Sequence, residues 1–519
     1  MSRKKSADYS KLRSIIQENL RVECESTKDL IYIDSGNEVQ DICTRQNHVV
    51  FARRGCGKTL LLHYSARVLN NDIKAIYLNC EDFKQHSFPN VLIEIFDAIF
   101  KELLKNLHGW FGRKKKLRQI VKEIIDELSS LRETEDISDI QVTTKTSSEE
   151  AKKVDFTAGY NAKKFGSLEI GAQTGANRKE DIEKNFYTKT DKLQRIDLRL
   201  PWFKQKIREF FEISSNVKFI FLQIDDFYHL RQEDQPYVVD YIHRLCKDVP
   251  LFFKIATLRH VSVLYSDHKG QPIGAQERHD YQPINIDYTF EDFQKTKNKN
   301  RQIFHQFGEL AGIKSTEFDT LFFKGEGFDR LVLAGGGVPR DTLSLFLEVF
   351  SNVQQNSDDR IGKDDVRILS KANFEHLIQE LKNDSELIEQ EPLVKAIYVI
   401  RTFCMEKRTS IFLVQEQTLQ QEDAFHRVIY RLLDYRIIHT AATALTHKSR
   451  EGTYQAFLVN IGCYAHLRKL DKKINEIDLS SPTAKDKMRS APILELNQFN
   501  TQFKQAPDNV EQILITEEN

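Results

Sequence analysis

The residues best suited to chemistry follow an apolar run that ends at Ala52. Glycines at 55 and 57 allow successive backbone N–H groups to point inward and to hold phosphate oxygens. Lys58 would supply a positive charge for the β- and γ-phosphates, and Thr59 a hydroxyl for Mg²⁺. The sequence therefore predicts a phosphate-binding loop between a strand and a helix. Its predicted binding residues are Gly55, Cys56, Gly57, Lys58 and Thr59.

Paired carboxylates end a second apolar run, residues 217–224, which is predicted to be a strand. In open α/β sheets, ligands bind at the carboxyl ends of strands, so Asp225 and Asp226 are expected beside the phosphate-binding loop. Asp225 is predicted to hold Mg²⁺ through bound water, and Asp226 to polarise the attacking water. The alternative is an acidic turn that only caps the next helix.

Two later segments offer further contacts to a nucleotide. The apolar run 251–258 leads to Arg259, a cation that would detect the γ-phosphate from the end of a strand. Glycines at 335–337 precede Pro339 and Arg340, and Pro339 suits the first turn of the helix that follows. The alternative for this second segment is a helix start without a function.

The order of the elements predicts an α/β fold. Strands at 49–52 and 74–80 flank a helix, and such a unit requires parallel strands. A helix at 8–22 and a short strand at 30–33 are predicted before them. Further along, residues 130–185 are rich in Ser, Thr, Lys and Glu, and a hairpin is predicted within them at 156–170. We interpret the stretch as a surface insertion, after which helices at 186–197 and 201–213 return the chain to the sheet.

The C-terminal part has the pattern of a winged helix: two helices precede a hairpin with strands at 437–443 and 454–460. Basic residues lie on the second helix and at the hairpin turn, where they would contact the phosphates of a nucleic acid. The alternative is docking of a protein partner. The candidate nucleic-acid contacts are Arg427, Arg431, Lys448 and Arg450. A polar, partly ordered tail is predicted from residue 471.

The composition of the whole chain narrows the class of protein but points to no partner. The 519 residues hold 76 acidic and 76 basic residues, so any basic surface must come from local clustering. The seven cysteines are scattered and odd in number, which argues against a disulfide framework or a zinc site and indicates a reducing cytosol. No stretch approaches the ~20 apolar residues that cross a bilayer. The sequence therefore predicts a cytoplasmic protein that does not bind membranes.

With these motifs placed, the chain resembles the STAND and origin-recognition-like clade of AAA+ P-loop ATPases. Residues 52–59 match the Walker A motif except at Ala52, where the motif has glycine, and residues 219–226 match Walker B. The Asp-Asp ending looks like the STAND form. Residues 257–259 are similar to the Thr-x-Arg sensor 1, and residues 337–339 to the Gly-x-Pro motif whose proline lies near the adenine. Arg340 is a looser match to a sensor 2 arginine.

The resemblance covers about residues 28–470 and implies three units in order: an ATPase core at 1–289, a helical lid at 290–385 and a winged helix at 386–470. The insertion at about 134–185 and the polar tail at 471–519 are predicted from their composition. The resemblance also implies ATP or ADP and Mg²⁺ as cofactors. The function that we predict is a slowly hydrolysing switch ATPase that changes conformation or assembly between its ATP and ADP states.

Such a switch would control a separately encoded partner or effector, and copies of the chain would assemble on binding ATP. Bacterial relatives of this kind often take part in antiviral defence. Two alternatives remain open. One is a DNA-binding initiator or loader, and the other is an interaction scaffold that binds nucleotide without turnover.

Overall fold

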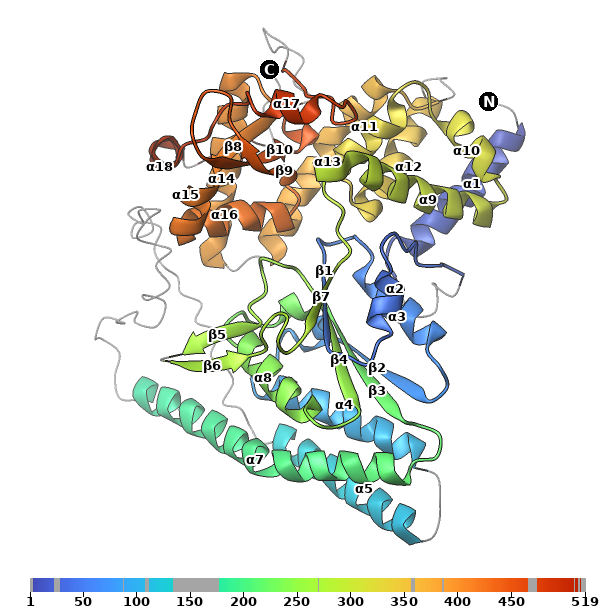
Figure 1. Cartoon of the computed structure of the whole chain (residues 1–519), viewed down its shortest axis with the longest axis vertical. Helices are drawn as coiled ribbons and strands as arrows, with labels where there is room; N and C mark the ends of the chain where they lie inside the picture. Colours follow the sequence, from blue (N-terminus) through green and yellow to red (C-terminus); the bar gives the residue numbers. More distant parts are fainter. Residues whose placement is uncertain are drawn as a thin grey trace.

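The computed structural model describes residues 3–22, 29–86, 88–107, 112–133, 177–268, 270–355, 360–384, 387–464, 474–507, 509–511 and 514. Figure 1 shows two tiers: a sheet with its helices below, and helices with a small second sheet above. The hairpin predicted at 156–170 lies outside the described residues, as does most of the insertion predicted at about 134–185. Its last part belongs to helix α7 (Asn177–Ile213).

The lower tier contains a five-stranded parallel sheet in the order β2-β3-β4-β1-β7, which confirms the predicted fold class. Its strands are β1 (His48–Phe51), β2 (Ile73–Asn79), β3 (Phe219–Asp225), β4 (Leu251–Thr257) and β7 (Gln282–Asn285). Phe51 lies opposite both Thr257 and Asn285, and Asp225 lies opposite Asn79. The carboxyl ends of these strands therefore lie along one edge, which is where the sequence places the candidate chemistry.

Successive residues of β1 face opposite sides of the sheet, as strand geometry requires. Val50 packs with α2 (Glu38–Ile42) and α3 (Lys58–Val68) on one face. Val49 belongs to the larger core on the other face. That core is formed with α4 (Asn90–Asn106), α5 (Gly112–Glu133), α7 and α8 (Gln235–Cys246), and a hairpin of β5 (Tyr265–His268) and β6 (Gln271–Gly274) projects beside them (Figure 1).

Three predicted elements of the core are wrong, two helices and one strand. The helices predicted at 186–197 and 201–213 are one helix, α7, with Pro201 inside it; burial of Leu200 and Phe203 beside the proline compensates for the lost backbone hydrogen bond. Residues 30–33 are not a strand. Side chains from two helices bind their carbonyl groups instead: Arg67 donates to the oxygen of Leu30, and Gln306 to that of Ile31.

The helical unit of the upper tier contains α9 (Phe293–Ala311), α10 (Ser315–Phe322), α11 (Gly327–Ala334), α12 (Pro339–Gln355) and α13 (Lys363–Asp384). The N-terminal helix α1 (Arg3–Asn19) packs on this unit rather than on the sheet (Figure 1). The ring of Tyr9 lies 4.4 Å from that of Phe350. Aromatic side chains of α9, α10 and α12 fill the centre of the unit, including Phe304, which meets Phe346 edge to face at 5.2 Å.

The C-terminal unit is built on an antiparallel sheet in the order β8-β10-β9. Its elements are α14 (Leu387–Lys407), β8 (Ile411–Gln415), α15 (Glu416–Gln421), α16 (Asp423–Asp434), β9 (Ile438–Thr446), β10 (Thr453–Val459), α17 (Ala484–Met488) and α18 (Leu496–Gln505). The two helices and the hairpin occur where the sequence predicts them, whereas β8 is an additional strand that the sequence pattern did not indicate.

The polar tail predicted from residue 471 is wrong for residues 474–507. Leu413 pairs with Ile493 through the backbone, and Phe499 of α18 packs against Phe425 of α16 at 5.0 Å. Spaced apolar residues, Met488, Leu494, Phe499 and Phe503, are buried in this way despite the polar composition around them. This stretch is therefore part of the C-terminal unit.

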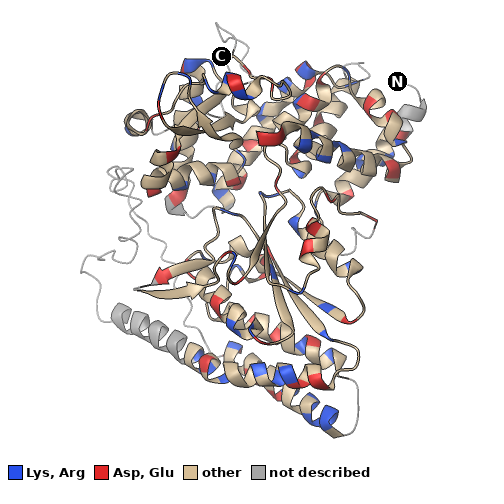
Figure 2. Ribbon diagram, viewed as in Figure 1, with Lys and Arg blue, Asp and Glu red and all other residues tan. Residues whose placement is uncertain are grey.

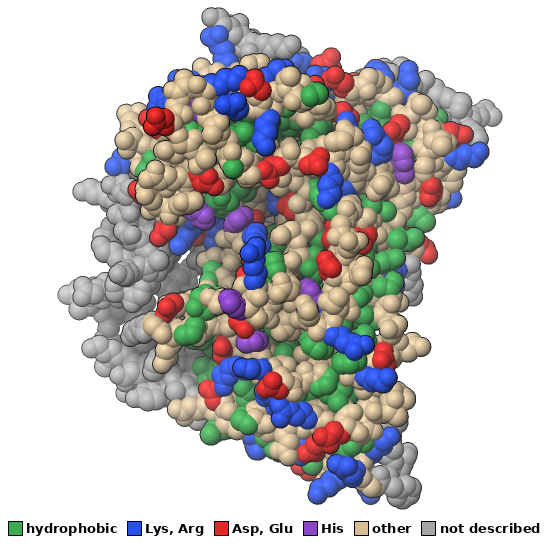
Figure 3. Space-filling model, in the orientation of Figure 1, with side chains coloured by type: hydrophobic (Ala, Val, Ile, Leu, Met, Phe, Trp, Pro, Cys, Tyr) green, Lys and Arg blue, Asp and Glu red, His purple; other side chains and the backbone are tan. Residues whose placement is uncertain are grey.

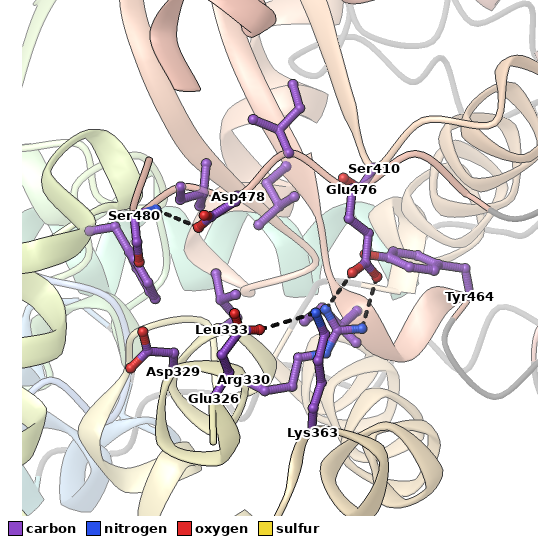
Figure 4. A pocket seen from close by; sticks show the side chains of 15 residues that line it. Glu326, Asp329, Arg330, Leu333, Lys363, Ser410, Tyr464, Glu476, Asp478 and Ser480 are labelled. Carbon is purple, nitrogen blue, oxygen red and sulfur yellow. Dashed lines mark hydrogen bonds and ion pairs between the residues drawn. The ribbon is translucent and has the colours of Figure 1, made fainter. Parts of the chain in front are cut away.

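A polar cavity of about 200 Å³ lies where the helical and C-terminal units meet (Figure 4). Arg330 of α11 is buried there and binds both carboxylate oxygens of Glu476, at 2.6 and 2.8 Å. Lys363 lies 3.3 Å from Glu326 at the rim. Carboxylates outnumber basic side chains in its lining, which holds Glu326, Asp329, Glu476 and Asp478 against Arg330 and Lys363.

Acidic and basic side chains are interspersed over both tiers, as Figure 2 shows, in keeping with the balanced composition. In the face that Figure 3 shows, histidines gather near the boundary between the tiers. In the part of the chain that the structure describes, no helix is both long and apolar enough to cross a bilayer.

Candidate active site

The predicted phosphate-binding loop joins β1 to α3 and has the required backbone. Gly55 and Gly57 have φ angles of 86° and 93°, in the left-handed region where glycine is favoured. Helix α3 begins at Lys58, directly after the second glycine. Its first N–H groups and its dipole therefore point into the loop, which is the arrangement that binds anions.

Lys58 is buried at the centre of this loop, with 5% of its surface exposed. Its Nζ donates to the carbonyl oxygens of Ala52, at 3.1 Å, and Arg53, at 3.4 Å. The ring of Tyr228 lies 5.9 Å from the same Nζ. The amine is thus held inside the curl of the loop, where a phosphate group could replace the two carbonyls.

Asp225 meets the loop from the end of β3 and is fully buried. The hydroxyl of Thr59 donates to its carboxylate, and that of Tyr77 does so at 2.9 Å. Burial, followed by the charge of Asp226, raises the pKa of Asp225 to about 6. A carboxylate and a hydroxyl in contact are the oxygen donors that Mg²⁺ prefers. Thr59 and Asp225 therefore fit as holders of the ion, which would supply positive charge beside the phosphates.

Asp226 follows in a left-handed conformation, with φ of 48°, which aspartate tolerates better than most residues. Its backbone N–H donates to Asp225 Oδ1 at 2.9 Å, and the residue is half-buried. This turn separates the two carboxylates: Asp225 is enclosed, while Asp226 retains access to solvent. The enclosed carboxylate of Asp225 is therefore suited to hold a metal ion, and the accessible carboxylate of Asp226 is suited to contact a water molecule.

Tyr77 is a member of the site that the sequence analysis missed. It lies in β2, two residues before the position opposite Asp225, and its ring contacts that of His63 at 4.3 Å. A tyrosine in an apolar strand gives no sign of function in the sequence. Only the pairing of β2 with β3 shows that its hydroxyl reaches the carboxylate.

Arg259 lies at the expected strand end but has a different partner. Its Nη2 is 3.3 Å from each carboxylate oxygen of Glu277, and its guanidinium lies 4.5 Å over the ring of Phe51. The side chain is 39% exposed. Its role as a γ-phosphate sensor therefore stays a prediction, and it would require Arg259 to leave Glu277.

The segment before α12 lies directly against the loop. The backbone N–H of Arg340 donates to the carbonyl of Gly55 at 3.3 Å. A Cβ atom on Gly55 would come within 2.9 Å of Val338, so this position needs glycine for its close contact as well as for its φ angle. The helical unit is thus in contact with the loop through the segment that the sequence singled out.

An apolar cavity of about 90 Å³ opens beside the three residues Gly55 to Gly57. Tyr32 and Ile33 line it from the segment before the core, and Ile303, Pro339 and Leu343 line it from the helical unit. It is continuous with the loop and has few polar walls. A flat apolar group attached to a phosphate chain would fit this combination of cavity and loop.

Arg53 forms a buried ion pair at the end of β7 and also links the loop to the upper tier. Its Nε and Nη2 donate to the two carboxylate oxygens of Asp287 at 2.7 and 2.8 Å. Burial opposes the charge on Asp287, but Arg53 outweighs it and lowers the pKa of this carboxyl to about 2. Arg53 Nη1 also donates to the carbonyl of Gly336 and to Nδ1 of His439, whose pKa burial lowers far below its usual value.

Arg436 makes the second link, from the turn between α16 and β9. Its Nη1 donates to both carboxylate oxygens of Asp341, at 2.8 and 2.9 Å, and to the carbonyl of Arg54 at 3.3 Å. Its Nη2 binds Glu380 of α13. Burial lowers the pKa of Arg436 to about 10, although Asp341 acts against this. One side chain of the C-terminal unit therefore binds both the loop and the helical unit.

The four candidate nucleic-acid contacts do not form one surface. Arg431 is buried and lies 3.3 Å from Glu389, so the prediction that it is a surface contact is wrong. Arg427, one turn earlier on α16, is half-buried. Lys448 pairs with Asp486 at 2.9 Å, and Arg450 with Glu495 at 2.6 Å. The predicted helix is present, but the side chain of Arg431 is buried beside α14 and is not on the surface.

Asp434 connects the C-terminal unit to the end of β4, and its contribution to the stability of the fold should depend on pH. Its Oδ2 accepts from the N–H groups of His260 and Val261, each at 2.9 Å. Burial raises its pKa to about 7, although these N–H groups and the charge of Arg431 act against this. The protonated carboxyl of Asp434 therefore contributes its full stabilisation below pH ~4, which is the pKa of an aspartate in an unfolded chain. This stabilisation is lost as the pH rises through about 7, the pKa in the folded protein.

We therefore expect Asp434→Asn to remove part of the pH dependence of folding. Asparagine keeps an oxygen acceptor for both N–H groups but carries no charge. Between pH 5 and 7 the wild type should lose up to about 1.4 kcal/mol per pH unit relative to the variant. Thermal unfolding of both proteins from pH 5 to 8 measures this difference and cancels the titration of other groups. A constant difference in melting temperature across that range would contradict it.

No protein-family model and no curated protein matches the sequence. Among solved structures, the Aeropyrum pernix ORC2 protein in ADPNP-ADP complexes matches at 11% identity and a TM-score of 0.31, over 85% of this chain and 87% of that one. A Walker-type ATPase of Pyrococcus abyssi matches at 9% identity and a TM-score of 0.39, over 84% of this chain and 96% of that one. Drosophila ORC bound to DNA matches at 13% identity and a TM-score of 0.31, over 88% of this chain and 91% of that one.

Structures this distant do not assign a function or a family to this chain, so its classification depends on its own residues. The five-stranded parallel sheet, the glycine loop between β1 and α3, and the aspartates at the end of β3 define an α/β P-loop NTPase fold.

Proposed function

We propose that this protein is an AAA+-type ATPase that binds ATP with Mg²⁺, hydrolyses it slowly, and acts as a conformational switch. The observation that carries the proposal is the meeting of Lys58, Thr59, Asp225 and Asp226 at one edge of the sheet. These residues supply a phosphate-binding cation, two metal-side oxygens and a carboxylate open to solvent. The apolar cavity beside the loop supports a nucleotide base as the group attached to the phosphates.

The proposal of a switch is supported by the contacts that all three units make with the loop. The sheet tier provides the loop itself, the helical unit binds Gly55 through Arg340, and the C-terminal unit binds the carbonyl of Arg54 through Arg436. A change in the loop on exchange of ADP for ATP would therefore alter contacts with both other units. Ligands shift such an equilibrium only by binding the two states differently. The γ-phosphate is the group that differs here.

The C-terminal unit, proposed to be a winged helix, would then pass the change to a protein partner. Its hairpin turn carries Lys448 and Arg450, but each is paired with a carboxylate of the 484–496 stretch. This pairing reduces the positive charge that DNA phosphates would meet. Docking of a partner protein is therefore the interpretation that we favour, and assembly of several copies on ATP binding belongs to the same proposal.

Phosphate release by wild-type protein and by Asp226→Asn tests the proposal. The variant should bind ATP as the wild type does but release phosphate at least about 100-fold more slowly, since asparagine cannot accept the proton of an attacking water. Asp240→Asn, which alters a surface pair with Arg244, is the matched control and should hydrolyse at the wild-type rate. Equal rates in all three proteins would exclude Asp226 from the mechanism, and no release by wild type would leave a scaffold without turnover.

A further inference from the structure

A third cavity, of about 490 Å³, lies beside the loop, between the lower tier and the C-terminal unit. Arg54 of the loop lines it, together with Tyr228, whose ring faces Lys58 Nζ at 5.9 Å. Glu389 and Arg431 line it from the C-terminal unit. The cavity therefore extends from Arg54 of the loop to a charged pair on another unit.

The charges around this cavity favour an anion. Two carboxylates line it, Glu81 and Glu389, whereas its lysine and arginines are four: Arg54, Lys84, Arg231 and Arg431. The positive excess lies beside the phosphate-binding loop, where it would add to the field of Lys58 and of the α3 N-terminus. A nucleotide with a third phosphate would extend toward this excess.

Arg431 is incompletely paired within the cavity wall. It is 5% exposed, and its Nη2 lies 3.3 and 3.4 Å from the two oxygens of Glu389, near the upper limit for hydrogen bonds. Among the residues that the structure describes, none accepts a hydrogen bond from its Nε. A buried guanidinium whose Nε has no acceptor has unused capacity to donate to an anion.

The position of Arg431 is fixed by contacts that follow it along the chain. Asp434, one turn later on α16, binds the backbone after β4 through His260 and Val261. Arg436, two residues further, binds the carbonyl of Arg54. These contacts hold this end of α16 against the carboxyl end of β4 and the phosphate-binding loop.

We propose that Arg431 leaves Glu389 when ATP binds and contacts the terminal phosphate, so that the C-terminal unit distinguishes ATP from ADP within one chain. This inference rests on the proposed function and assigns its γ-phosphate contact to α16. Release of Glu389, at the start of α14, would transmit the exchange into the C-terminal unit. An arginine suits this role because its planar guanidinium can bind two phosphate oxygens at once.

Calorimetric titration of the full chain with ADP and with a non-hydrolysable ATP analogue tests the inference. Arg431→Gln should weaken binding of the analogue roughly 10- to 100-fold, the value of one charge-assisted contact, and change ADP binding less than about twofold. Glu389→Gln should strengthen binding of the analogue relative to ADP, because Arg431 loses its competing partner. A role of Arg431 in folding alone would not produce opposite effects in these two variants.

Arg330→Gln is the matched control, since it removes a buried arginine from a pair with Glu476 at the other cavity (Figure 4). Its ratio of analogue to ADP affinity should equal that of wild type. An unchanged ratio in Arg431→Gln, or equal loss of both nucleotides, would overturn the inference while the proposed function stands. Failure of wild type to bind either nucleotide would overturn both.

Discussion

Replacing Lys58 with alanine should abolish measurable binding of ATP and ADP while the protein still folds. The amine is buried in the loop, and among the described residues its hydrogen bonds go to two backbone carbonyls. A phosphate group offers it a full negative charge instead. Charge-assisted hydrogen bonds contribute about 1.5–3 kcal/mol each, so losing contacts to two phosphates should weaken binding roughly 100-fold or more.

Titration calorimetry with each nucleotide measures this loss, and thermal unfolding shows whether the variant is folded. Lys105→Ala is a suitable control because Lys105 is 74% exposed and pairs with Glu102 at the surface, at 3.3 Å. In the control, added ADP should raise the melting temperature as it does in wild type. It should have no such effect in Lys58→Ala. Wild-type affinity in a folded Lys58→Ala protein would show that the nucleotide site lies elsewhere.

The parts of this site that could be predicted from sequence are those fixed by local geometry. The loop from Gly55 to Thr59 depends on residue types at adjacent positions, and the structure gives it the predicted strand, turn and helix. Asp225 could be placed because an apolar strand that ends in a carboxylate delivers it to a known edge of a parallel sheet. In both cases, the signal is contained within about ten residues of chain.

What the sequence could not show depends on contacts between distant segments. Arg53 and Asp287 are 234 residues apart, and Tyr77 and Asp225 are 148 apart, so only the order of the strands brings each pair together. Arg431 has the spacing of a surface residue on an amphipathic helix, yet it is buried beside Glu389 of α14. Periodicity predicts that a helix has two faces, but it does not say what covers them.

Arg436→Ala should destabilise the folded protein by about 3–5 kcal/mol, the cost of breaking a buried ion pair by removing one partner. The side chain is 2% exposed and neutralises Asp341 and Glu380, both of which lie in the helical unit. Removing it leaves two carboxylates in a buried setting, where Arg340 lies 3.4 Å from Glu380 and can neutralise only part of their charge. The C-terminal unit should also become easier to detach from the other two.

Urea unfolding gives the free energy, and limited proteolysis reports whether the C-terminal unit is released first. Arg450→Ala is the matched control: this arginine also pairs with a glutamate, at 2.6 Å, but is 60% exposed, and such surface pairs contribute about 0–1 kcal/mol. Combining Arg436→Met with Asp341→Leu should recover much of the loss, since apolar groups of similar size can replace a buried ion pair. If Arg436→Ala were as stable as Arg450→Ala, the contact between Arg436 and the loop carbonyl of Arg54 could not be what joins the C-terminal unit to the nucleotide site.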